Sequence, residues 1–455
     1  MGVVRCALLA TFFPAATPLP KPPPQGGRER SGVWGASFSS ARTNVIVSVE
    51  SKENDLKRKH DRVIVAGGGP VGSVAALLLA RAGIPVTMIE RATDVVLDYR
   101  ASTFHPPTLD LLEASGIAAA LVEMGLICPT VQIRDRETGK VAEFDVTRLK
   151  AETRHPYRLQ CEQFKLVGWV YRELAKVPGI DLRFGHDVTA IHQTDDEVVV
   201  EAEHQGERVV VRGDIVIGCD GGRSTVRKLM DIPFPGFTYP EHFLIAGTTF
   251  DFRGHMPDIA SVNYTADPVR WFMLLQIPDM WRILLPVAPE VAPDDAVSEQ
   301  GLQSSLQSIY ARPSPYEIVV RAIYRVHQRV AETYRQGRVF LAGDAAHLNN
   351  PLGGMGLNGG LHDVISLTDR LAAWWRGEAD AAILDGYEPQ RRPEAINAIH
   401  AITERNKKLL EERDPDVRRR NLDQIRKTAA DPELSYKYLL DSAMISSLRR
   451  SGMIR

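Results

Sequence analysis

Residues 62–72 read RVIVAGGGPVG and continue into an Ala- and Leu-rich run that ends at Ala82. The β-branched run 62–66 predicts a buried strand, and the run from Pro70 to Ala82 predicts a helix, because proline suits the first helical turn. A second apolar run, Ile84–Glu90, follows directly. The three segments form one β-α-β unit, which is typical of an α/β fold built on a parallel sheet.

The glycines of this segment match the pattern G-x-G-x-x-G at Gly67, Gly69 and Gly72. The first glycine permits a tight turn, the second lets backbone approach a pyrophosphate, and the third lets helix and strand close together. The helix start at Pro70 and Val71 offers a positive potential to phosphates. The motif predicts dinucleotide binding. The alternative is a glycine-rich turn that packs the helix on the sheet and binds nothing.

Glu90, followed by Arg91, lies at the end of the second predicted strand. A carboxylate at this place accepts hydrogen bonds from the adenosine ribose of a bound dinucleotide. Strand, glycine turn, helix and acid are therefore all present in the order that the motif requires.

The composition excludes several classes of partner. The chain has 55 basic and 57 acidic residues, so its charge does not favour nucleic acid or an anionic membrane surface. The longest apolar runs, such as Ala75–Ala80 and Trp271–Ile277, are shorter than the roughly 18 residues of a membrane span, and we expect no integral membrane segment. The four cysteines are far apart, which predicts neither a zinc site nor disulfides and favours a reducing, cytoplasmic setting; no metal is expected.

The first 60 residues differ from the rest. They contain many prolines between Pro14 and Pro24, and Glu29 is the only acid before Glu50. Such a segment cannot bury a core, so residues 1–60 are predicted to be a disordered extension or the result of a mis-assigned start. A signal peptide around Cys6–Ala16, or a transit peptide over the whole segment, is the alternative.

Further along, the pattern predicts more elements. We expect a β-meander, then a buried strand, then a separate sheet with a hairpin around Pro278-Asp279-Met280, and finally a mostly helical region from 378 to 455. The predicted helices are Pro106–Ala114, Cys161–Val177 and Leu361–Trp375. The predicted strands are Ile180–Phe184, Val188–His192, Glu197–Glu203 and Val209–Arg212 of the meander, Ile215–Cys219, Trp271–Ile277, Trp281–Val287 and Val339–Ala342.

Two further motifs carry a resemblance. Residues 339–347 read VFLAGDAAH and are followed by NPLGGMGLNGG at 350–360, while residues 219–227 read CDGGRSTVR. With the first glycine motif, they resemble the class A flavoprotein monooxygenases, the para-hydroxybenzoate hydroxylase group. The resemblance implies an α/β architecture: a Rossmann-like, GR2-type FAD-binding domain with an inserted β-sheet substrate domain and C-terminal helices. The expected bounds are 61–235 and 331–390 for the FAD-binding domain, 236–330 for the substrate domain, and 391–455 for the helical region.

The resemblance also implies roles. Asp344 would bond the ribityl chain, Pro351 would hold its carbonyl near the flavin, and a helix starting near Leu357 would direct its positive end at the flavin. The alternatives are a helix cap for Asp344 and Asp220, a surface position for Arg100 and Arg223, and a solvated Gln160. The residues expected to contact FAD are Gly67, Gly69, Pro70, Val71, Gly72, Glu90, Arg91, Arg100, Gln160, Asp220, Gly343, Asp344, Pro351, Gly354, Gly356, Leu357 and Asn358.

The activity that the resemblance implies is a monooxygenase that uses FAD, NADH or NADPH, and O2. It would hydroxylate a phenolic or related aromatic small molecule through a flavin C4a-hydroperoxide, as a monomer or homodimer. Two alternatives stay open: a reductase or dehydrogenase of the same superfamily, and a flavin-binding protein without turnover.

The substrate side is harder to read from sequence. The apolar run Trp271–Leu285 suits an aromatic ligand and equally suits a plain core. Pro351, His327 and Tyr324 are the candidates for a catalytic role. His242, His255 and Tyr264 are further candidates for proton transfer, and Arg270, Arg282 and Arg321 are candidates for holding a carboxylate.

Overall fold

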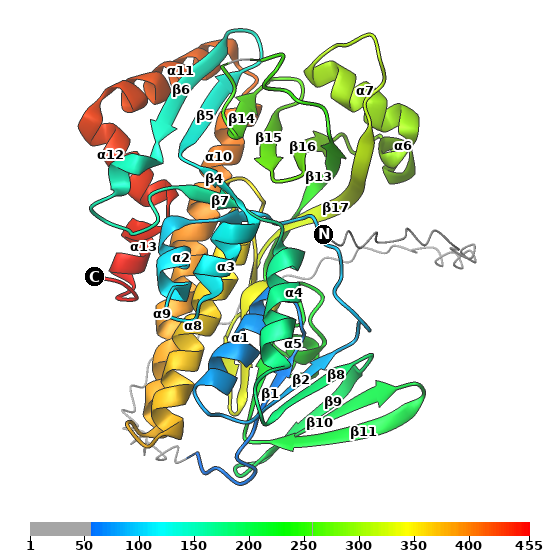
Figure 1. Ribbon diagram of the computed structural model, residues 1–455, viewed down its shortest axis with the longest axis vertical. Helices are drawn as coiled ribbons and strands as arrows, with labels where there is room; N and C mark the ends of the chain where they lie inside the picture. Colours follow the sequence, from blue (N-terminus) through cyan, green and yellow to red (C-terminus); the bar gives the residue numbers. More distant parts are fainter. Residues whose placement is uncertain (1–55, 257) are drawn as a thin grey trace, which may run out of the picture. The chain divides into compact units, whose positions relative to one another are not determined.

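The computed structural model describes residues 56–256 and 258–455 (Figure 1). The extension predicted for residues 1–60 lies outside this part of the chain, except for its last five residues. Within the described ranges, no helix is long and apolar enough to cross a bilayer.

The β-α-β unit predicted from the sequence is present. Strand β1 pairs in parallel with β2 on one side and with β12 on the other, and β12 pairs in parallel with β19. Helix α1 (Pro70–Arg81) connects β1 to β2. The six-stranded sheet has the order β18 (Arg335–Gln336), β19 (Val339–Leu341), β12 (Ile215–Gly218), β1 (Val63–Ala66), β2 (Val86–Glu90) and β8 (Ile180–Phe184).

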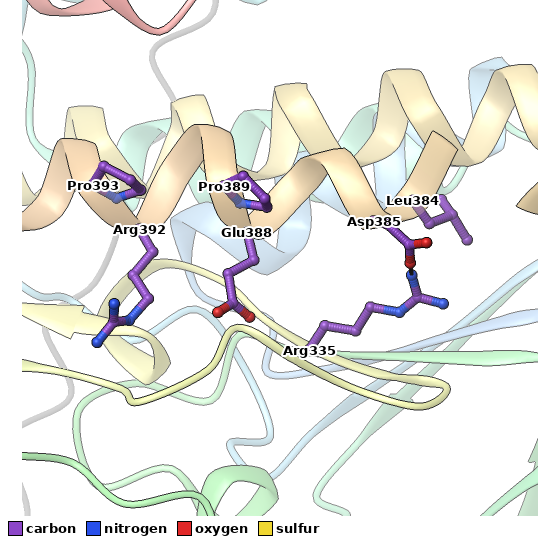
Figure 2. Close-up of a pocket in the computed structure, with 7 residues that line it drawn as sticks. All are labelled: Arg335, Leu384, Asp385, Glu388, Pro389, Arg392 and Pro393. Carbon is purple, nitrogen blue, oxygen red and sulfur yellow. Dashed lines mark hydrogen bonds and ion pairs between the residues drawn. The ribbon is translucent and has the colours of Figure 1, made fainter. Parts of the chain in front are cut away.

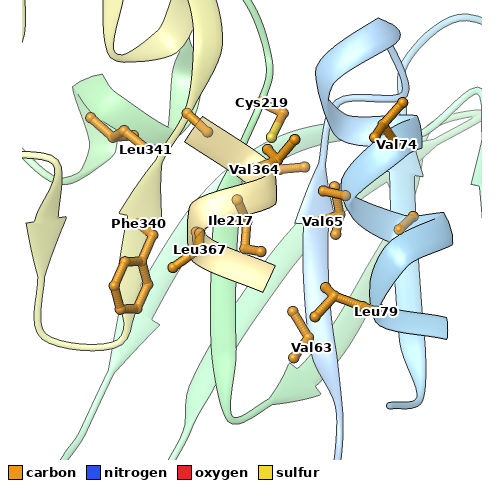
Figure 3. Packing of buried hydrophobic residues seen from close by; sticks show 14 of the residues in the cluster. Val63, Val65, Val74, Leu79, Ile217, Cys219, Phe340, Leu341, Val364 and Leu367 are labelled. Atoms are coloured by element: carbon orange, nitrogen blue, oxygen red, sulfur yellow. The ribbon is translucent and has the colours of Figure 1, made fainter. Parts of the chain in front are cut away.

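One face of this sheet is packed by helices α1 and α8 (Met355–Trp375). Val63 and Val65 of β1 and Ile217 of β12 lie against side chains of both helices, in a single buried cluster (Figure 3). Strand residues alternate between faces, so Ile64 points the other way, toward Gly213 at the end of β11. Helix α8 begins at Met355, earlier than the predicted start at Leu361.

The meander contains three strands rather than the predicted four. β9 (Asp187–Gln193), β10 (Val198–His204) and β11 (Glu207–Gly213) form an antiparallel sheet, whereas β8 pairs in parallel with β2. The prediction that Ile180–Phe184 belongs to the meander was therefore wrong. The pairing between β8 and β2 joins segments that are far apart in the sequence. The hydrophobic pattern of a short segment does not show which distant strand it pairs with.

The separate sheet has eight strands. The predicted hairpin is confirmed, because β15 and β16 pair antiparallel around Pro278 and Asp279. Two of the strands, β5 and β6, come from residues before 236, and β5 pairs in parallel with β14. The order is β20 (His347–Leu348), β17 (Ile318–Val330), β13 (Gly236–Thr248), β16 (Met280–Val287), β15 (Phe272–Ile277), β14 (Val262–Ala266), β5 (Thr130–Asp135) and β6 (Gly139–Asp145).

The two faces of this sheet contact different parts of the chain. One face packs on helices α6 and α7 through Phe272, Trp281, Ile283 and Leu285. The other, which we call the inner face, packs on Leu352 and on C-terminal helices through side chains such as Phe243, Met273 and Tyr264. The predicted apolar wall is thus divided between two faces, because alternate residues of a strand point in opposite directions.

The remaining elements connect and cover these sheets, and α11 packs on β6 (Figure 1). A small sheet contains β3 (Thr103–Phe104), β7 (Arg158–Gln160) and β4 (Leu126–Cys128). The other helices are α2 (Pro106–Leu112), α3 (Ile117–Met124), α4 (Gln163–Leu174), α5 (Thr225–Leu229), α6 (Pro293–Val297), α7 (Glu299–Ile309), α9 (Tyr387–Glu394), α10 (Ala401–Glu411), α11 (Pro415–Ala430), α12 (Pro432–Ser442) and α13 (Ile445–Arg450). Short turns of helix are η1 (Val146–Leu149), η2 (Gly343–Ala345), η3 (Ala381–Gly386) and η4 (Ala395–His400).

Candidate active site

The three sequence motifs meet at one edge of the six-stranded sheet. They follow the carboxyl ends of β1, β12 and β19, which are parallel neighbours and so end at the same edge. Gly67 has a φ of +103°, and a Cβ at this position would lie 2.5 Å from the carbonyl oxygen of Cys219. Only glycine fits between these two chain segments, which brings the first and second motifs into contact.

Two glycines of the first motif have opposite surroundings. A Cβ on Gly72 would lie 1.9 Å from the carbonyl oxygen of Gly67, so this glycine closes the helix on the strand. A Cβ on Gly69 would meet no atom of the described chain within 4 Å. Helix α1 has no side-chain cap at its N-terminus. The helix therefore presents free backbone N–H groups to an open space beside Gly69.

Glu90 orients the glycine turn from the end of β2. Its carboxylate accepts hydrogen bonds from the N–H groups of Gly68 at 2.6 Å and Ala92 at 2.8 Å. The hydroxyl of Tyr171 donates to the carbonyl of Gly68 at 2.6 Å. Each oxygen of a carboxylate has two acceptor positions, so Glu90 retains capacity for a ribose hydroxyl. Arg91 is exposed.

Asp344 and Arg100 influence each other across the edge of the sheet. Burial raises the pKa of Asp344, and the positive charge of Arg100 partly offsets that effect. Arg100 itself is exposed and donates to Asp98 at 2.6 and 2.9 Å. Among the described residues, no hydrogen bond to the Asp344 carboxylate is found. A carboxylate held half-buried without a donor is suited to accept hydrogen bonds from a ligand.

Gln160 lies in the core of the small sheet. It is fully buried, accepts a hydrogen bond from the hydroxyl of Ser102 at 2.9 Å and donates to that of Thr103 at 3.0 Å. The alternative of a solvated glutamine is therefore wrong.

In the Asp-Gly motif, Asp220 acts as a helix cap. Its carboxylate accepts from the N–H groups of Thr225 at 2.6 Å and Val226 at 3.0 Å. Arg223 is exposed. Arg227 is buried and joins the second motif to the third, because it donates to the carbonyls of Ala345 at 2.8 Å and Gly222 at 3.0 Å. Sequence reasoning passed over Arg227, although its position one turn into the helix was a usable signal.

Helix α8 begins with an uncapped N-terminus at Gly354, which has a φ of +71°. The Asn358 side chain donates to the carbonyls of Thr103 at 2.9 Å and Gly354 at 2.6 Å. Its oxygen accepts from the His105 N–H at 2.9 Å and from the Thr108 hydroxyl at 2.7 Å. The side chain of Asn358 is thus fully used in fixing the helix start, which leaves the backbone of the first turn, from Met355 to Leu357, available.

The glycines of α8 separate into two kinds. A Cβ on Gly359 would lie 2.6 Å from Ile399, and one on Gly360 would lie 2.7 Å from Val71. These two glycines allow close packing of the helix against its neighbours. A Cβ on Gly356 would lie 3.0 Å from the side-chain oxygen of Asn349, and Gly356 is half-buried.

The segment before α8 is attached to the inner face. The N–H of Asn350 donates to the Gln328 side chain at 3.1 Å, and the Asn350 side chain donates to the Tyr239 hydroxyl at 3.2 Å. Pro351, between Asn350 and the buried Leu352, is half-buried. His105 holds the same segment from the other side, because its Nε2 donates to the Gly353 carbonyl at 2.8 Å. Burial lowers the pKa of His105 to about 3, so the ring is neutral.

The two predicted catalytic candidates on β17 face in opposite directions. Tyr324 lies on the inner face, beside Phe243, and burial raises its pKa. His327 is an odd number of residues away and points to the other face, where its ring bonds the hydroxyl of Thr238 at 2.8 Å. The structure therefore separates Tyr324 from His327.

Two arginines accompany Tyr324 near the inner face. Arg282 is buried and donates to the carbonyl of Tyr99 at 2.6 Å. Arg158, which the sequence analysis missed, is buried and donates to the hydroxyl of Tyr264 at 3.0 Å. The other candidates lie elsewhere: His255 and Arg321 are exposed, Arg270 donates to Ser308 at 2.6 Å, and His242 neighbours Arg325.

A surface pocket of about 350 Å³ lies beside β18, away from this edge (Figure 2). Its charged groups already have partners. Arg335 pairs with Asp385, Glu388 accepts from the N–H of Tyr334 at 2.8 Å, and Arg392 donates to the carbonyl of Ala331 at 2.9 Å. Since these charged groups are already paired within the described part of the chain, the carboxyl edge of the sheet is the better candidate for the active site.

Comparison with known proteins identifies the family of the chain. Residues 61–401 match the family model described as an FAD binding domain. The chain is 31% identical to para-nitrophenol 4-monooxygenase of Pseudomonas sp. (strain WBC-3), over 86% of this chain and 97% of that one. It is also 31% identical to 6-hydroxy-3-succinoylpyridine 3-monooxygenase of Pseudomonas putida, over 74% of this chain and 86% of that one.

The fold is similar to solved structures of the same kind. The crystal structure of p-nitrophenol 4-monooxygenase from Pseudomonas putida DLL-E4 superposes with a TM-score of 0.81 at 31% identity, covering 85% of this chain and 97% of that one. A ternary complex of aklavinone-11 hydroxylase with FAD and aklavinone superposes with a TM-score of 0.69 at 26% identity, covering 78% and 70% of the two chains.

Proposed function

Because this chain belongs to the FAD binding domain family and is an FAD-dependent aromatic monooxygenase, we propose that it holds FAD at the carboxyl edge of the six-stranded sheet. With NADH or NADPH and O2 it hydroxylates a phenolic ring bound between this edge and the inner face of the eight-stranded sheet. The names of three relatives, para-nitrophenol 4-monooxygenase, 6-hydroxy-3-succinoylpyridine 3-monooxygenase and a 3-(3-hydroxy-phenyl)propionate hydroxylase, favour oxygen insertion over the reductase alternative.

The residues at the edge fit FAD. Gly69 borders open space at the uncapped start of α1, where the pyrophosphate would accept hydrogen bonds from backbone N–H groups. Asp344, whose carboxylate lacks a donor within the described chain, would accept hydrogen bonds from the ribityl hydroxyls. Glu90 would bond the adenosine ribose. The uncapped first turn of α8 would place its positive end near the pyrimidine part of the ring.

FAD, when bound, supplies the hydride acceptor and the centre that activates oxygen. The protein supplies a dry, oriented cavity. Leu352, Met273 and Leu284 on and near the inner face exclude water. Tyr264 and Tyr324 can hydrogen-bond a phenolic oxygen, and Arg158 and Arg282 favour its ionised form, which is the more electron-rich ring.

Three further statements belong to this proposal. The nicotinamide cofactor binds transiently, because the chain has one dinucleotide motif of the β-α-β kind. The enzyme acts as a monomer or a homodimer. A reducing, cytoplasmic setting suits Cys128, Cys161 and Cys219, which are buried free thiols.

The experiment that tests this proposal follows NAD(P)H oxidation by the purified protein under O2, with a panel of phenols and hydroxybenzoates. We expect a yellow protein whose NAD(P)H consumption rises with one class of aromatic and yields a product heavier by one oxygen atom. Consumption without an oxygenated product would support the reductase. A protein that retains no FAD would contradict the cofactor assignment.

Gly69→Ala tests the cofactor position directly. Gly69 has a φ of −63°, which alanine adopts without strain, and its Cβ meets nothing in the described chain, so the apoprotein should keep its stability. The methyl group would occupy the pyrophosphate space, and we expect the Kd for FAD, measured by fluorescence titration, to rise at least about tenfold, or 1.4 kcal/mol. Gly168→Ala on α4, where the Cβ has ordinary contacts, is the control. Unchanged FAD affinity in Gly69→Ala would contradict the proposed position.

A further inference from the structure

Most peptide groups of the glycine turn after β1 are already hydrogen-bonded within the chain. The Gly67 N–H donates to a carbonyl of β2 at 2.8 Å, and the Gly68 N–H donates to the Glu90 carboxylate at 2.6 Å. Pro70 has no N–H. Among the described residues, no acceptor is found for the Gly69 N–H. This N–H, at the uncapped start of α1, is therefore free to bond a ligand.

Tyr171, on α4, fixes the peptide group that carries this N–H. Its hydroxyl donates to the Gly68 carbonyl at 2.6 Å, and that carbonyl belongs to the same peptide group as the Gly69 N–H. The described residues contain no cis peptide bond, so the carbonyl and the N–H point in opposite directions. Because the carbonyl is held toward Tyr171, the Gly69 N–H points away from the tyrosine hydroxyl.

The contact between Tyr171 and the turn is tight. A Cβ on Gly68 would lie 2.4 Å from the hydroxyl oxygen of Tyr171 and 3.1 Å from the Cβ of Glu90. The backbone of Gly68 is outside the left-handed region, so these two side chains, and not the backbone conformation, exclude an alanine there. Gly68 is thus held between Tyr171, which bonds its carbonyl, and Glu90, which bonds its N–H.

The surroundings of Tyr171 keep its hydroxyl a hydrogen-bond donor. Burial, and next the negative charge of Glu90, raise the pKa of Tyr171, so the phenol stays protonated. Its ring packs edge-on against Phe184 of β8, with 5.0 Å between the ring centroids. A donor that bonds a carbonyl also polarises the peptide group, and this strengthens the N–H of the same group as a donor. Tyr171 therefore both orients and strengthens the Gly69 N–H.

We propose that Tyr171 is a positioning residue for the cofactor, which holds the peptide group between Gly68 and Gly69 so that the Gly69 N–H is ready to bond the pyrophosphate of FAD. A donor that is oriented before the ligand arrives costs less to order on binding. This inference rests on the proposed function, since it concerns the affinity of the same FAD site. The alternative is a hydroxyl that only stabilises the fold, like that of Tyr316, which donates to the Tyr310 carbonyl at 2.6 Å.

The test measures the Kd for FAD by fluorescence titration of the apoprotein, without NAD(P)H or an aromatic substrate, so that no turnover is needed. Tyr171→Phe removes the hydroxyl and keeps the ring, and we expect the Kd to rise about fivefold or more. Tyr316→Phe is the matched control, because it removes a hydroxyl that bonds a backbone carbonyl at the same distance in the cluster of α6 and α7. Its Kd should stay within about twofold of the unchanged protein.

A second variant reaches the same contact and leaves the tyrosine in place. Gly68→Ala puts a Cβ against the Tyr171 hydroxyl, and we expect it to raise the Kd about tenfold. In the Tyr171→Phe background the hydroxyl oxygen is gone, so the added Gly68→Ala should raise the Kd by less than about threefold. Gly168→Ala on α4 is the control for the glycine-to-alanine change. Gly68→Ala alone covers the case in which Tyr171→Phe fails to fold.

A spectroscopic readout separates positioning from stability. Phosphorus NMR of the FAD-saturated protein reports the surroundings of the pyrophosphate. We expect its resonances to shift in Tyr171→Phe and to keep their positions in Tyr316→Phe. Urea denaturation of the two apoproteins measures the stability that each variant loses with its hydrogen bond.

The proposal is overturned if Tyr171→Phe loses stability as Tyr316→Phe does but keeps the Kd for FAD and the phosphorus resonances of the unchanged protein. It is also overturned if Gly68→Ala leaves the Kd unchanged, or raises it equally in both backgrounds. An unchanged protein that binds no FAD would contradict the proposed function together with this inference. If the affinities change as expected and no hydroxylated product forms, the proposed function alone fails.

Discussion

Buried charges in this protein occur in two contrasting regions. Near the carboxyl edge of the six-stranded sheet, Asp363 of α8 accepts hydrogen bonds from Arg391 at 2.8 Å, from the His347 ring at 2.8 Å and from the Gly343 N–H at 3.1 Å. At the inner face, Arg158 and Arg282 each have a single neutral acceptor. Within the described residues, the first region pairs its buried charges, and the second leaves two positive charges without a paired carboxylate.

The difference separates structural groups from groups available to a ligand. Although burial opposes ionisation of Asp363, the charges of His347 and Arg391 hold its pKa below the ordinary value. That network fixes β19, η2 and α8, the elements that carry the third motif. Among the described residues, Arg158 and Arg282 at the inner face have no comparable network.

The largest expected effect is the loss of the compensated network. Asp363→Asn leaves the Arg391 guanidinium buried without a negative partner, and we expect the free energy of unfolding to fall by about 3 to 5 kcal/mol. Urea denaturation of the apoprotein measures this change. Asp385→Asn removes the partner of Arg335 from an exposed position and should cost less than about 1 kcal/mol. A similar small loss in Asp363→Asn would show that the two regions do not differ in the way described.

The next effect concerns the pH dependence of stability and the buried His362 of α8. Burial, and secondarily the charge of Arg391, lower the pKa of His362 well below its ordinary value. In the unfolded chain His362 therefore binds a proton at about pH 6.5, whereas in the native protein it stays neutral at this pH. The contribution of the neutral His362 ring to the free energy of unfolding is therefore complete above about pH 6.5. It is lost as the pH falls below this value, by about 2 kcal/mol between pH 6.5 and 5.

His362→Gln should remove this part of the acid sensitivity. We expect the difference in unfolding free energy between pH 7.5 and pH 5, measured by urea denaturation, to shrink by about 2 kcal/mol relative to the unchanged protein. His255→Gln, at an exposed position, is the control. An identical pH dependence in His362→Gln and the unchanged protein would contradict a neutral, buried ring.

Sequence could predict what depends on neighbours along the chain. The β-α-β unit, the hairpin of β15 and β16 and the three motifs all follow from short patterns with local causes. The order of strands in the sheets could not be predicted in this way. β8 pairs with β2 rather than with the meander, and β5 joins β14, because such pairings depend on which segments meet in space.

The site shows the same limit. Residue type and spacing predicted roles for the glycines and Asp344, and they passed over Arg227 and Arg158. The structure distinguishes these arginines by burial and by their acceptors, which have no local signal in the sequence. Successive side chains of β17 point to opposite faces of the sheet, and this separates Tyr324 from His327. The sequence had made both residues equal candidates for a catalytic role.

The smallest expected effect tests whether the Asp344 carboxylate, at the carboxyl edge of the six-stranded sheet, is also available to a ligand. Burial raises the pKa of Asp344, so its ionised form is disfavoured in the native apoprotein. Above its raised pKa, the ionised Asp344 carboxylate lowers the stability of the native apoprotein. This loss of stability disappears as the pH falls and the native carboxylate becomes protonated. Asp344→Asn should therefore stabilise the apoprotein at neutral pH by up to about 1 kcal/mol, with a gain that vanishes toward acid pH.

The same change should weaken FAD binding about tenfold or more, since a charged acceptor is lost. Thermal unfolding of the apoprotein and FAD titration measure the two effects. If Asp344→Asn instead destabilises the apoprotein and leaves the FAD affinity unchanged, Asp344 is a structural residue like Asp363. The carboxyl edge would then contain no buried charge that is held for a ligand.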